Sequence, residues 1–271
     1  MNSGVPVGEG HGAPASPTSK VLVIVPFPMS SDDVASRAAQ RDSVRLDPGV
    51  ELTYVPVRVA PGSYDSYADY ALADVGIVDA GLDAQRLGYD AVCVDTMSDS
   101  GVAALRSLLE IPVVGTARAA YCLALGLGER FGVLAMWSAW FPMYKKILAE
   151  QGLTDRCVTM RAPEIQPDNR KLLAGREAEV LPHLLEAAKA CVDEDGADVI
   201  VLGSTTMHAA HAYLRAHLEV PVVNPGPASY RFAQMSMELG LAHSRRAYRG
   251  PRQSPAETIR LMADAVGRRD P

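Results

Sequence analysis

The chain has 271 residues, and its 26 Lys and Arg against 32 Asp and Glu give a net charge of -6. This length suffices for one large domain or two small ones, and 48% hydrophobic with 21% charged residues argues against global disorder, a coiled coil or a fibrous repeat. The absence of a basic excess argues against nucleic acid as a partner. No apolar run is long enough for a membrane helix. The four cysteines are scattered and fit neither a disulfide scaffold nor a zinc module.

The first 19 residues differ in composition from the rest of the chain. Residues 1–19 are rich in Gly, Pro and Ser and contain no Lys or Arg. A secretory signal needs a positive start and an apolar stretch, and this segment has neither. We therefore predict a disordered tail at 1–19 and expect the protein to be cytoplasmic.

From Lys20 on, apolar β-branched runs alternate with segments of helical periodicity. We expect strands at 21–25, 51–57, 90–94 and 111–115, with helices at 30–40, 66–88, 101–109 and 119–128. The cycle then restarts, with strands at 131–136, 157–160, 198–203 and 220–223, and helices at 139–152, 174–194, 206–218, 227–240 and 254–269. Strands that alternate with helices imply parallel sheets covered by helices on both faces.

The chain also contains an internal duplication. The segment EIPVVGTARAAY at 110–121 returns as EVPVVNPGPASY at 219–230, so that Tyr121 matches Tyr230. The segment at 90–98 likewise matches the one at 198–206. Any two parallel α/β units share apolar strands, but not these identities, which indicate two related halves.

Two related α/β halves leave a cleft between them, and ligands of parallel sheets bind beyond the carboxyl ends of the strands. The loops after strands 90–94 and 198–203 then face each other, which places Thr96 opposite Ser204. Backbone N–H groups and hydroxyls at such turns suit a carboxylate or a developing enolate, although each hydroxyl taken alone is better explained as a helix cap. Both loops are rich in such hydroxyls, which favours a small anionic or carbonyl-bearing ligand.

Other residues near this cleft allow two interpretations. His208 follows Ser204 closely enough to act as an acid, a base or a hydrogen-bond donor, or it is a capping or solvent-facing histidine. His208 and His211 lack an obvious third ligand, so we predict no metal site. Trp137 is either core or an apolar wall of the cleft, and the four cysteines are best explained as small core residues. The Pro26–Ser30 turn lacks a glycine-rich phosphate loop, which leaves NAD, FAD and ATP unsupported and no cofactor expected.

At these residues the sequence resembles the aspartate/glutamate/hydantoin racemase superfamily, and most of all its hydantoin racemase branch. The resemblance runs from Lys20 to about Pro251. It is carried by VLVIVPFPMS with Ser30 at the position of the family's loop serine, DAVCVDTMSDSG, IPVVG, RFGVLAMWSAWFPM, DVIVLGS and GLAHSRRAYRGP.

The resemblance implies two pseudo-symmetric Rossmann-like, or flavodoxin-like, parallel-sheet α/β domains with the active site in the cleft between them. We expect residues 20–115 with about 225–271 to form the first domain, and 116–224 to form the second. Racemases of this superfamily use no cofactor, and two cysteines, one from each half, exchange a proton on opposite faces of the substrate carbon. Relatives with one or both cysteines include arylmalonate decarboxylase and maleate isomerase.

This sequence departs from the superfamily where the two thiols are expected, because Thr96 and Ser204 occupy those positions. A cysteine thiolate is accessible near neutral pH, whereas an aliphatic hydroxyl needs an adjacent base. We therefore expect an enzyme that acts on a small carboxylate or carbonyl carbon acid by racemisation, isomerisation, decarboxylation or lyase-type chemistry, but not by two thiolates. The alternatives are a family member that binds a carboxylate without catalysis and a racemase with an unrecognised base.

The residues expected to form this site come from both halves. Thr96 and Ser204 are the expected catalytic pair, and Asp99 or His208 is the expected proton shuttle. Substrate binding is expected from Ser30, Met97, Ser98, Thr205, Thr206 and Trp137. The expected partner is the small-molecule substrate, and association into a homo-oligomer is left open.

Overall fold

The computed structural model describes residues 18–166 and 176–267. Most of the predicted tail, residues 1–17, lies outside the described residues, as does the start of the helix predicted at 174–194. The first strand begins at Ser19, the last residue of the predicted tail.

The first half of the chain forms a four-stranded parallel sheet in the order β2-β1-β3-β4. Its strands are β1 (Ser19–Val25), β2 (Val50–Pro56), β3 (Ala91–Val94) and β4 (Val113–Gly115). The helices between them are α1 (Ser31–Ala38), the short 3-10 helix η1 (Ala39–Ser43), α2 (Tyr67–Gly81) and α3 (Val102–Leu108).

The second half repeats this topology as a parallel sheet in the order β6-β5-β7-β8. Its strands are β5 (Phe131–Leu134), β6 (Cys157–Arg161), β7 (Val199–Leu202) and β8 (Val222–Val223). Its helices are α4 (Thr116–Leu125), α5 (Phe141–Glu150), α6 (Glu177–Asp193) and α7 (Ala210–His217), with short 3-10 helices η2 (Ser138–Trp140), η3 (Thr154–Arg156) and η4 (Thr205–Met207). Each strand takes the place of its counterpart in the first sheet, which confirms the predicted fold of two related parallel-sheet halves.

The central strands are apolar along their whole length because helices cover both faces of each sheet. Along β1, Leu22 and Ile24 pack into a cluster with α2 and α3, whereas Val21 and Val23 pack into a cluster with α8 (Pro225–Glu238). The period of two along the strand therefore divides one apolar run between two hydrophobic cores.

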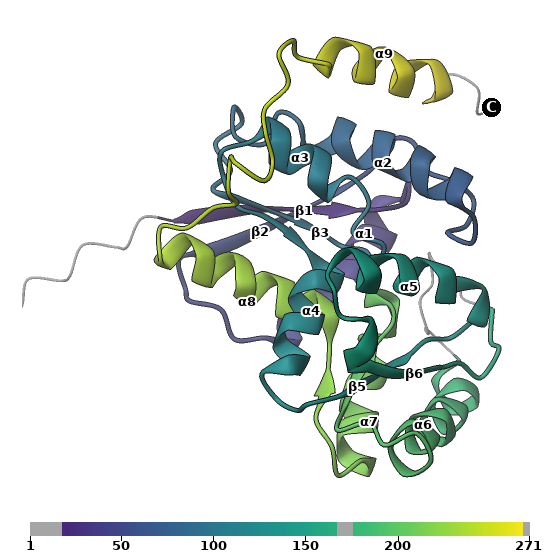
Figure 1. Cartoon of the computed structure of the whole chain (residues 1–271). Coiled ribbons are helices and arrows are strands. Elements are labelled where there is room, and N and C mark those ends of the chain that lie inside the picture. The colour runs from purple at the N-terminus through teal and green to yellow at the C-terminus, as the bar shows by residue number, and fades with distance from the viewer. Residues whose placement is uncertain (1–17, 167–175, 268–271) are drawn as a thin grey trace, which may run out of the picture.

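The two halves exchange a helix. Helix α4 follows β4 of the first sheet, yet its Tyr121 packs with Phe131 and other residues of the second sheet. Helix α8 follows β8 of the second sheet, yet its Tyr230 packs with Val23 and other residues of the first. Figure 1 shows α4 and α8 next to each other between the two sheets, and the contacts between them are extensive. The matched tyrosines of the duplication are thus matched anchors, each fully buried against the other half's sheet.

The last helix, α9 (Ala256–Gly267), returns to the first half. It lies along α2, where Asp264 pairs with Arg58 and Arg260 pairs with Asp83. This packing, together with the helix exchange, supports the division into residues 20–115 with 225–271 and residues 116–224, which stays a prediction.

Most predicted elements differ from the observed ones by a few residues at their ends, and three are markedly shortened or divided. The helix predicted at 66–88 ends at Gly81, and turns follow up to Gly88, whose φ of 82° lies in the left-handed region. The strand predicted at 220–223 keeps only Val222 and Val223, because Pro221 has no N–H for the ladder. The helix predicted at 206–218 is divided into η4 and α7.

Candidate functional site

The loops after β3 and β7 meet in one pocket between the two halves. Five of the expected site residues line it: Thr96, Met97, Ser204, Thr205 and Thr206. The rest of its wall is formed by Pro26, Phe27, Arg37, Tyr64, Asp95, Trp140, Met143 and Gly203. The pocket lies at the carboxyl ends of both central strands, where open parallel sheets bind their ligands.

The hydroxyls of the two loops have matching geometry. In the first loop, Thr96 Oγ1 lies 3.2 Å from Ser98 Oγ and accepts from the Ser98 N–H at 3.3 Å. In the second, Ser204 Oγ lies 2.8 Å from Thr206 Oγ1 and accepts from the Thr206 N–H at 3.2 Å. The duplication therefore extends to the hydrogen bonds of the site, with Thr96 and Ser204 as equivalent, half-buried groups.

Neither central hydroxyl has a base bound to it among the described residues. The hydrogen-bond partners of Thr96 and Ser204 are the hydroxyl and the N–H two residues further along each loop. A hydroxyl needs a hydrogen-bonded base to become a nucleophile or a base itself. The loops therefore offer hydrogen-bond donors and a polar surface to a ligand rather than a ready thiolate equivalent.

A buried ion pair lies at the edge of this pocket. Arg37 Nε donates to Asp95 Oδ2 at 2.7 Å, and Arg37 Nη2 donates to the Asp95 carbonyl oxygen at 3.1 Å. The two side chains are 2% and 0% exposed. Arg37 Nη2 also donates to Thr205 Oγ1, so that a helix of the first half binds the loop after β7 in the second half. Sequence reasoning missed Arg37, because an arginine on a short helix is normally solvent-exposed.

The ion pair belongs to a larger buried polar group. Gln40 Nε2 donates to Asp95 Oδ2 at 3.1 Å. Arg37 Nη1, Asp95 Oδ1 and Gln40 Oε1 are buried and have no hydrogen-bond partner within the part of the chain that the structure describes. Buried polar atoms of this kind normally pair with a ligand, an ion or ordered water. Asp95 stands directly before Thr96 at the end of a buried strand, and that position was the signal that could have identified it.

Asp99, expected as a proton shuttle, instead caps helix α4. Its carboxylate accepts from the N–H groups of Ala117 and Arg118 at 2.8 and 3.0 Å. Burial raises the pKa of Asp99 to about 6, although these two N–H groups oppose the shift. The carboxylate does not line the pocket, and its two oxygens are used at the start of α4.

The remaining expected residues lie around the pocket rather than in its wall. Ser30 is exposed and caps α1, accepting from the Asp33 N–H at 3.2 Å. Ser98 is buried behind Thr96 and donates to Ser100 Oγ at 2.9 Å. Trp137 packs at the border of a core cluster, and Trp140 lines the pocket in its place.

His208 lies beside the polar group but not in the wall of the pocket. It is half-buried, and its pKa is lowered by burial and by the positive charge of Arg37. A neutral imidazole at this position can accept a proton, but no hydrogen bond orients it among the described residues.

The four cysteines lie outside the pocket. Cys93 and Cys191 are buried, and burial raises the pKa of each thiol to about 12. Cys157 is half-buried, with a pKa raised by burial to about 11. Cys122 is exposed on α4, so the prediction that it is a core residue is wrong.

The pocket is small as it stands. Its free volume of about 30 Å³ is far below the roughly 300–1,000 Å³ of typical small-molecule pockets. Large side chains fill the rest of the cleft, among them Phe27, Tyr64, Trp140 and Met143. A substrate of several heavy atoms therefore requires these side chains, or the two halves, to move apart.

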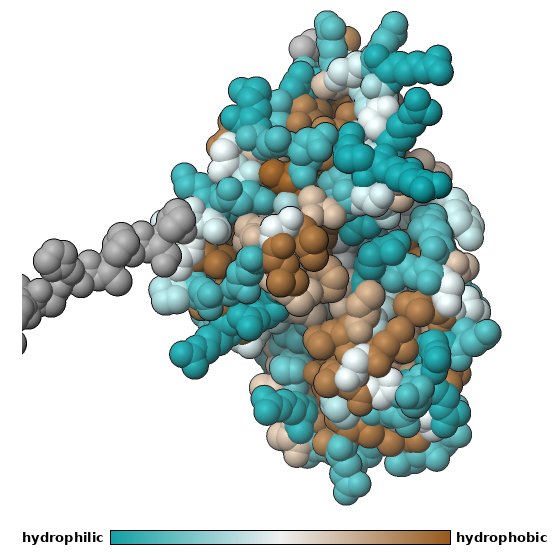
Figure 2. All heavy atoms as spheres, turned by 60° about the vertical axis from the view of Figure 1, so that its left-hand side comes forward, coloured by the Kyte–Doolittle hydropathy of each residue, from teal (hydrophilic) through white to brown (hydrophobic). Residues whose placement is uncertain are grey.

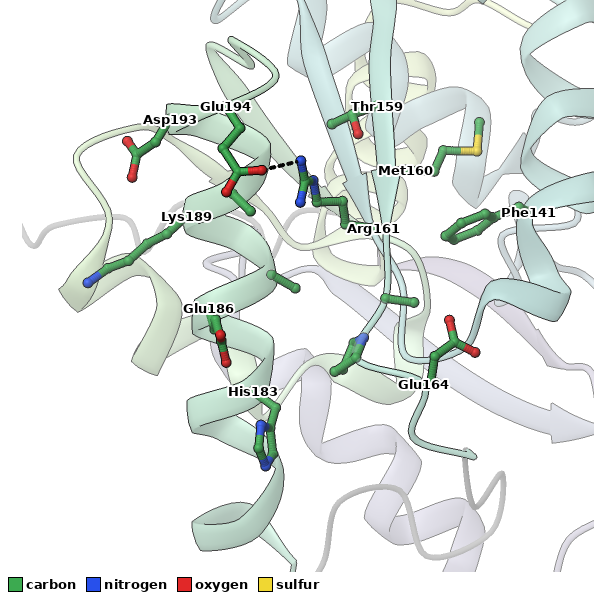
Figure 3. A pocket seen from close by; sticks show the side chains of 14 residues that line it. Phe141, Thr159, Met160, Arg161, Glu164, His183, Glu186, Lys189, Asp193 and Glu194 are labelled. Atoms are coloured by element: carbon green, nitrogen blue, oxygen red, sulfur yellow. Dashed lines mark hydrogen bonds and ion pairs between the residues drawn. The ribbon is translucent and has the colours of Figure 1, made fainter.

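A larger cavity lies elsewhere, between β6 and α6. Figure 3 shows its charged rim, with His183, Glu186 and Lys189 along α6 and Arg161 reaching across to Glu194 at 2.7 Å. Its free volume is about 890 Å³, but it contains none of the matched loops. Because the cavity includes no residue of the two loops that the duplication pairs, we assign no site there.

Two further properties concern the described residues as a whole. Across residues 18–166 and 176–267, no group of three or more His, Cys, Asp or Glu is placed to hold a metal ion. No helix within the same ranges has the length and apolar character needed to cross a membrane.

Known proteins share this sequence pattern and fold. Residues 22–233 match the family model of the Asp/Glu/hydantoin racemases. A hydantoin racemase of Pseudomonas sp. (strain NS671) is 27% identical over 235 residues, which cover 86% of this chain and 92% of that protein.

Solved structures of other proteins also align with this chain over most of its length. An allantoin racemase from Klebsiella pneumoniae aligns with a TM-score of 0.78 and 25% identity, over 88% of this chain and 95% of that one. An arylmalonate decarboxylase, at 21% identity and a TM-score of 0.56 over 84% of this chain and 96% of that one, shares the fold.

Proposed function

The chain belongs to the Asp/Glu/hydantoin racemase family, and we propose that it is a cofactor-independent enzyme that acts on a small carboxylate or carbonyl carbon acid without thiolates. Its reaction is a racemisation, isomerisation, decarboxylation or lyase-type step. The observation that carries this proposal is the pairing of Thr96 and Ser204, at matched positions, in one pocket between the halves.

The two loops suit the stabilisation of an anion. Hydroxyls and backbone N–H groups placed around a developing enolate lower its energy, most of all where water is excluded. Such donors come from opposite sides of the pocket, from Thr96 in one loop and from Ser204 and Thr206 in the other. Each hydroxyl can donate to a ligand once it gives up its hydrogen bond within its own loop. The guanidinium of Arg37, whose Nη1 has no hydrogen-bond partner among the described residues, adds a fixed positive group at the same wall.

The arrangement favours reactions that begin without a strong base. In a decarboxylation, the electron pair of the breaking carbon–carbon bond passes to the α-carbon, and the protein needs to stabilise the enolate and then supply a proton. In a racemisation, a base must first remove the α-proton. No base is hydrogen-bonded to Thr96 or Ser204 among the described residues. The site therefore suits a decarboxylation better than a racemisation, because a decarboxylation does not begin with removal of a proton by a base.

Substrate binding requires the pocket to enlarge. Its present volume of about 30 Å³ is too small for a carbon acid of several heavy atoms. The aromatic side chains of Phe27, Tyr64 and Trp140 then become the wall of the enlarged site, which favours a substrate with an apolar substituent.

The test is to incubate the protein in D₂O with hydantoins, allantoin, amino acids and substituted malonates, and to follow each α-hydrogen by NMR. Loss of carbon dioxide, movement of a double bond or exchange at the α-carbon supports the proposal. Thr96→Ala and Ser204→Ala should each lower that activity, whereas Ser30→Ala, at an exposed helix cap, should not. An activity untouched by both site variants would show that the site is elsewhere.

A second candidate is a family member that binds a small carboxylate without catalysis. The observation that favours it is that Thr96 and Ser204 each bond to a neighbouring hydroxyl, and that neither bonds to a base within the described part of the chain. It predicts that malonates bind, as seen by ligand NMR, while none of the substrates exchanges hydrogen or loses carbon dioxide.

A further inference from the structure

Apolar side chains gather on the outer face of the exchanged helices α4 and α8. The large exposed ones are Leu123, Leu127, Phe232 and Met235, with Leu239 and Leu241 where α8 ends. Figure 2 shows apolar side chains gathered in the middle and lower part of this side of the molecule, with hydrophilic residues around them. Leu239 and Leu241 are 63% and 60% exposed, which is unusual for leucines in such a group.

A groove runs between the two helices on this face. It has a free volume of about 690 Å³, and its lining includes Leu123, Leu127, Phe232 and Met235 together with Ala119 and Pro227. The groove is separate from the candidate active site, because it contains none of the residues of that pocket. A groove of this kind is ready to receive apolar side chains from another helix.

Two opposite charges flank the apolar stretch of α8. Arg231 and Glu238 are both exposed and both line the groove, seven residues apart. Two helical turns separate them, or about 10 Å along the axis. Between them lies Gln234, which bonds to both side chains, and neither charge forms an ion pair with another described residue.

We propose that this face binds a second copy of the chain about a two-fold axis, with α8 packed antiparallel against α8 of the partner subunit. In this arrangement the axis passes midway between Arg231 and Glu238, near Met235, in the second half of α8. Arg231 of each copy then lies beside Glu238 of the other, and the apolar side chains of each copy enter the other's groove.

The charge pattern is the reason to choose a second copy over another partner. The helix carries one cation and one anion on either side of an apolar stretch. When two such helices pack antiparallel, the cation of each lies beside the anion of the other, so the surface is complementary to a second copy of itself. The apolar side chains supply the free energy of association, because the hydrophobic effect is proportional to the area removed from water. The charges set the direction in which the two helices pack.

The oligomeric state of the full chain tests the proposal, by sedimentation velocity and light scattering from about 1 to about 100 micromolar. The wild type should form dimers, or larger assemblies built from them. Phe232→Asp with Met235→Asp should raise the dissociation constant of the dimer about thirtyfold or more. Leu87→Asp, at an equally exposed leucine away from this face, is the matched control and should associate like the wild type.

Charge reversal tests the direction of packing. Arg231→Glu alone and Glu238→Arg alone should each weaken association about tenfold, and the two together should restore it. A monomeric wild type, full association of the α8 variant, or no restoration in the double reversal would each overturn the proposal. A monomer that dimerises only after deletion of residues 1–17 would also overturn it, because that segment would then be the occupant of the groove.

Discussion

The buried ion pair between Arg37 and Asp95 gives the sharpest prediction about stability. We expect Asp95→Asn to destabilise the chain strongly, although the substitution changes only one atom and hardly changes volume. Asp95 is fully buried and accepts from Arg37 Nε at 2.7 Å and from Gln40 at 3.1 Å. With the carboxylate neutralised, Arg37 keeps its charge at 2% exposure and loses the group that compensates it.

The magnitude follows from the burial of both partners. Removal of one member of a buried ion pair costs about 3–5 kcal/mol, because it leaves an uncompensated charge in the interior. For a chain of this length, each kcal/mol corresponds to a shift of about 2–4 °C in the midpoint of thermal unfolding, so we expect a decrease of about 6–20 °C. The hydrogen bond from Arg37 to Thr205 weakens at the same time, so the substitution also loosens the loop after β7.

The assay is urea denaturation followed by circular dichroism, with calorimetry for the midpoint. Asp264→Asn is the matched control, because it breaks an ion pair of 2.6 Å whose partners are 54% and 41% exposed, and such pairs contribute at most about 1 kcal/mol. Arg37→Met with Asp95→Leu should be more stable than Asp95→Asn, since no unpaired charge remains. If Asp95→Asn loses less than about 1 kcal/mol, the ion pair does not hold the site together and the reasoning fails.

The other predictions concern Asp99, the hydroxyls and a buried glycine. Asp99→Ala should lower the free energy of unfolding by about 1–2 kcal/mol in urea, because α4 loses its cap, and Asp99→Asn should cost less, because asparagine tolerates the φ of 47°. Burial raises the pKa of Asp99 to about 6, so protonation of this carboxyl stabilises the folded chain. The contribution is present below pH 3.8 and is lost as the pH rises through 6. The free energy of unfolding of the wild type, relative to that of Asp99→Asn, should therefore fall between pH 4 and 7, and a rise would contradict the assignment. Thr96→Ala and Ser204→Ala should each reduce any carbon-acid activity at least about tenfold without lowering the unfolding midpoint by more than a few degrees, and an unchanged turnover would remove them from the site. Gly76→Ala should cost at least about 2 kcal/mol in urea, because its Cβ would lie 1.9 Å from the Val59 carbonyl oxygen, whereas Gly62→Ala, with open space around it, should be neutral.

The helix exchange explains why the duplication was visible in the sequence. Tyr121 and Tyr230 are each fully buried against the sheet of the other half, so both positions of the repeat serve the same packing role. A change at either one would affect both halves. The sequence identities between 110–121 and 219–230 are thus explained by the packing of each segment against the other half, and not by the strands alone.

Sequence alone was sufficient for the parts of this protein that depend on local pattern. Runs of buried β-branched residues predicted the strands, and the repeat predicted that the loops at Thr96 and Ser204 would meet, because parallel strands end at the same edge of their sheets. Five expected site residues therefore line one pocket.

Only the tertiary structure decided which side chains the chain brings to those loops from afar. Arg37 meets Asp95 across 58 residues and Thr205 across 168, and no local periodicity records such a contact. The same holds for Asp99, whose carboxylate turns to the start of α4 because the N–H groups of Ala117 and Arg118 compete for it. Hydrophobic patterning sets which face of an element is buried, whereas the partner of a buried polar group depends on how distant elements pack.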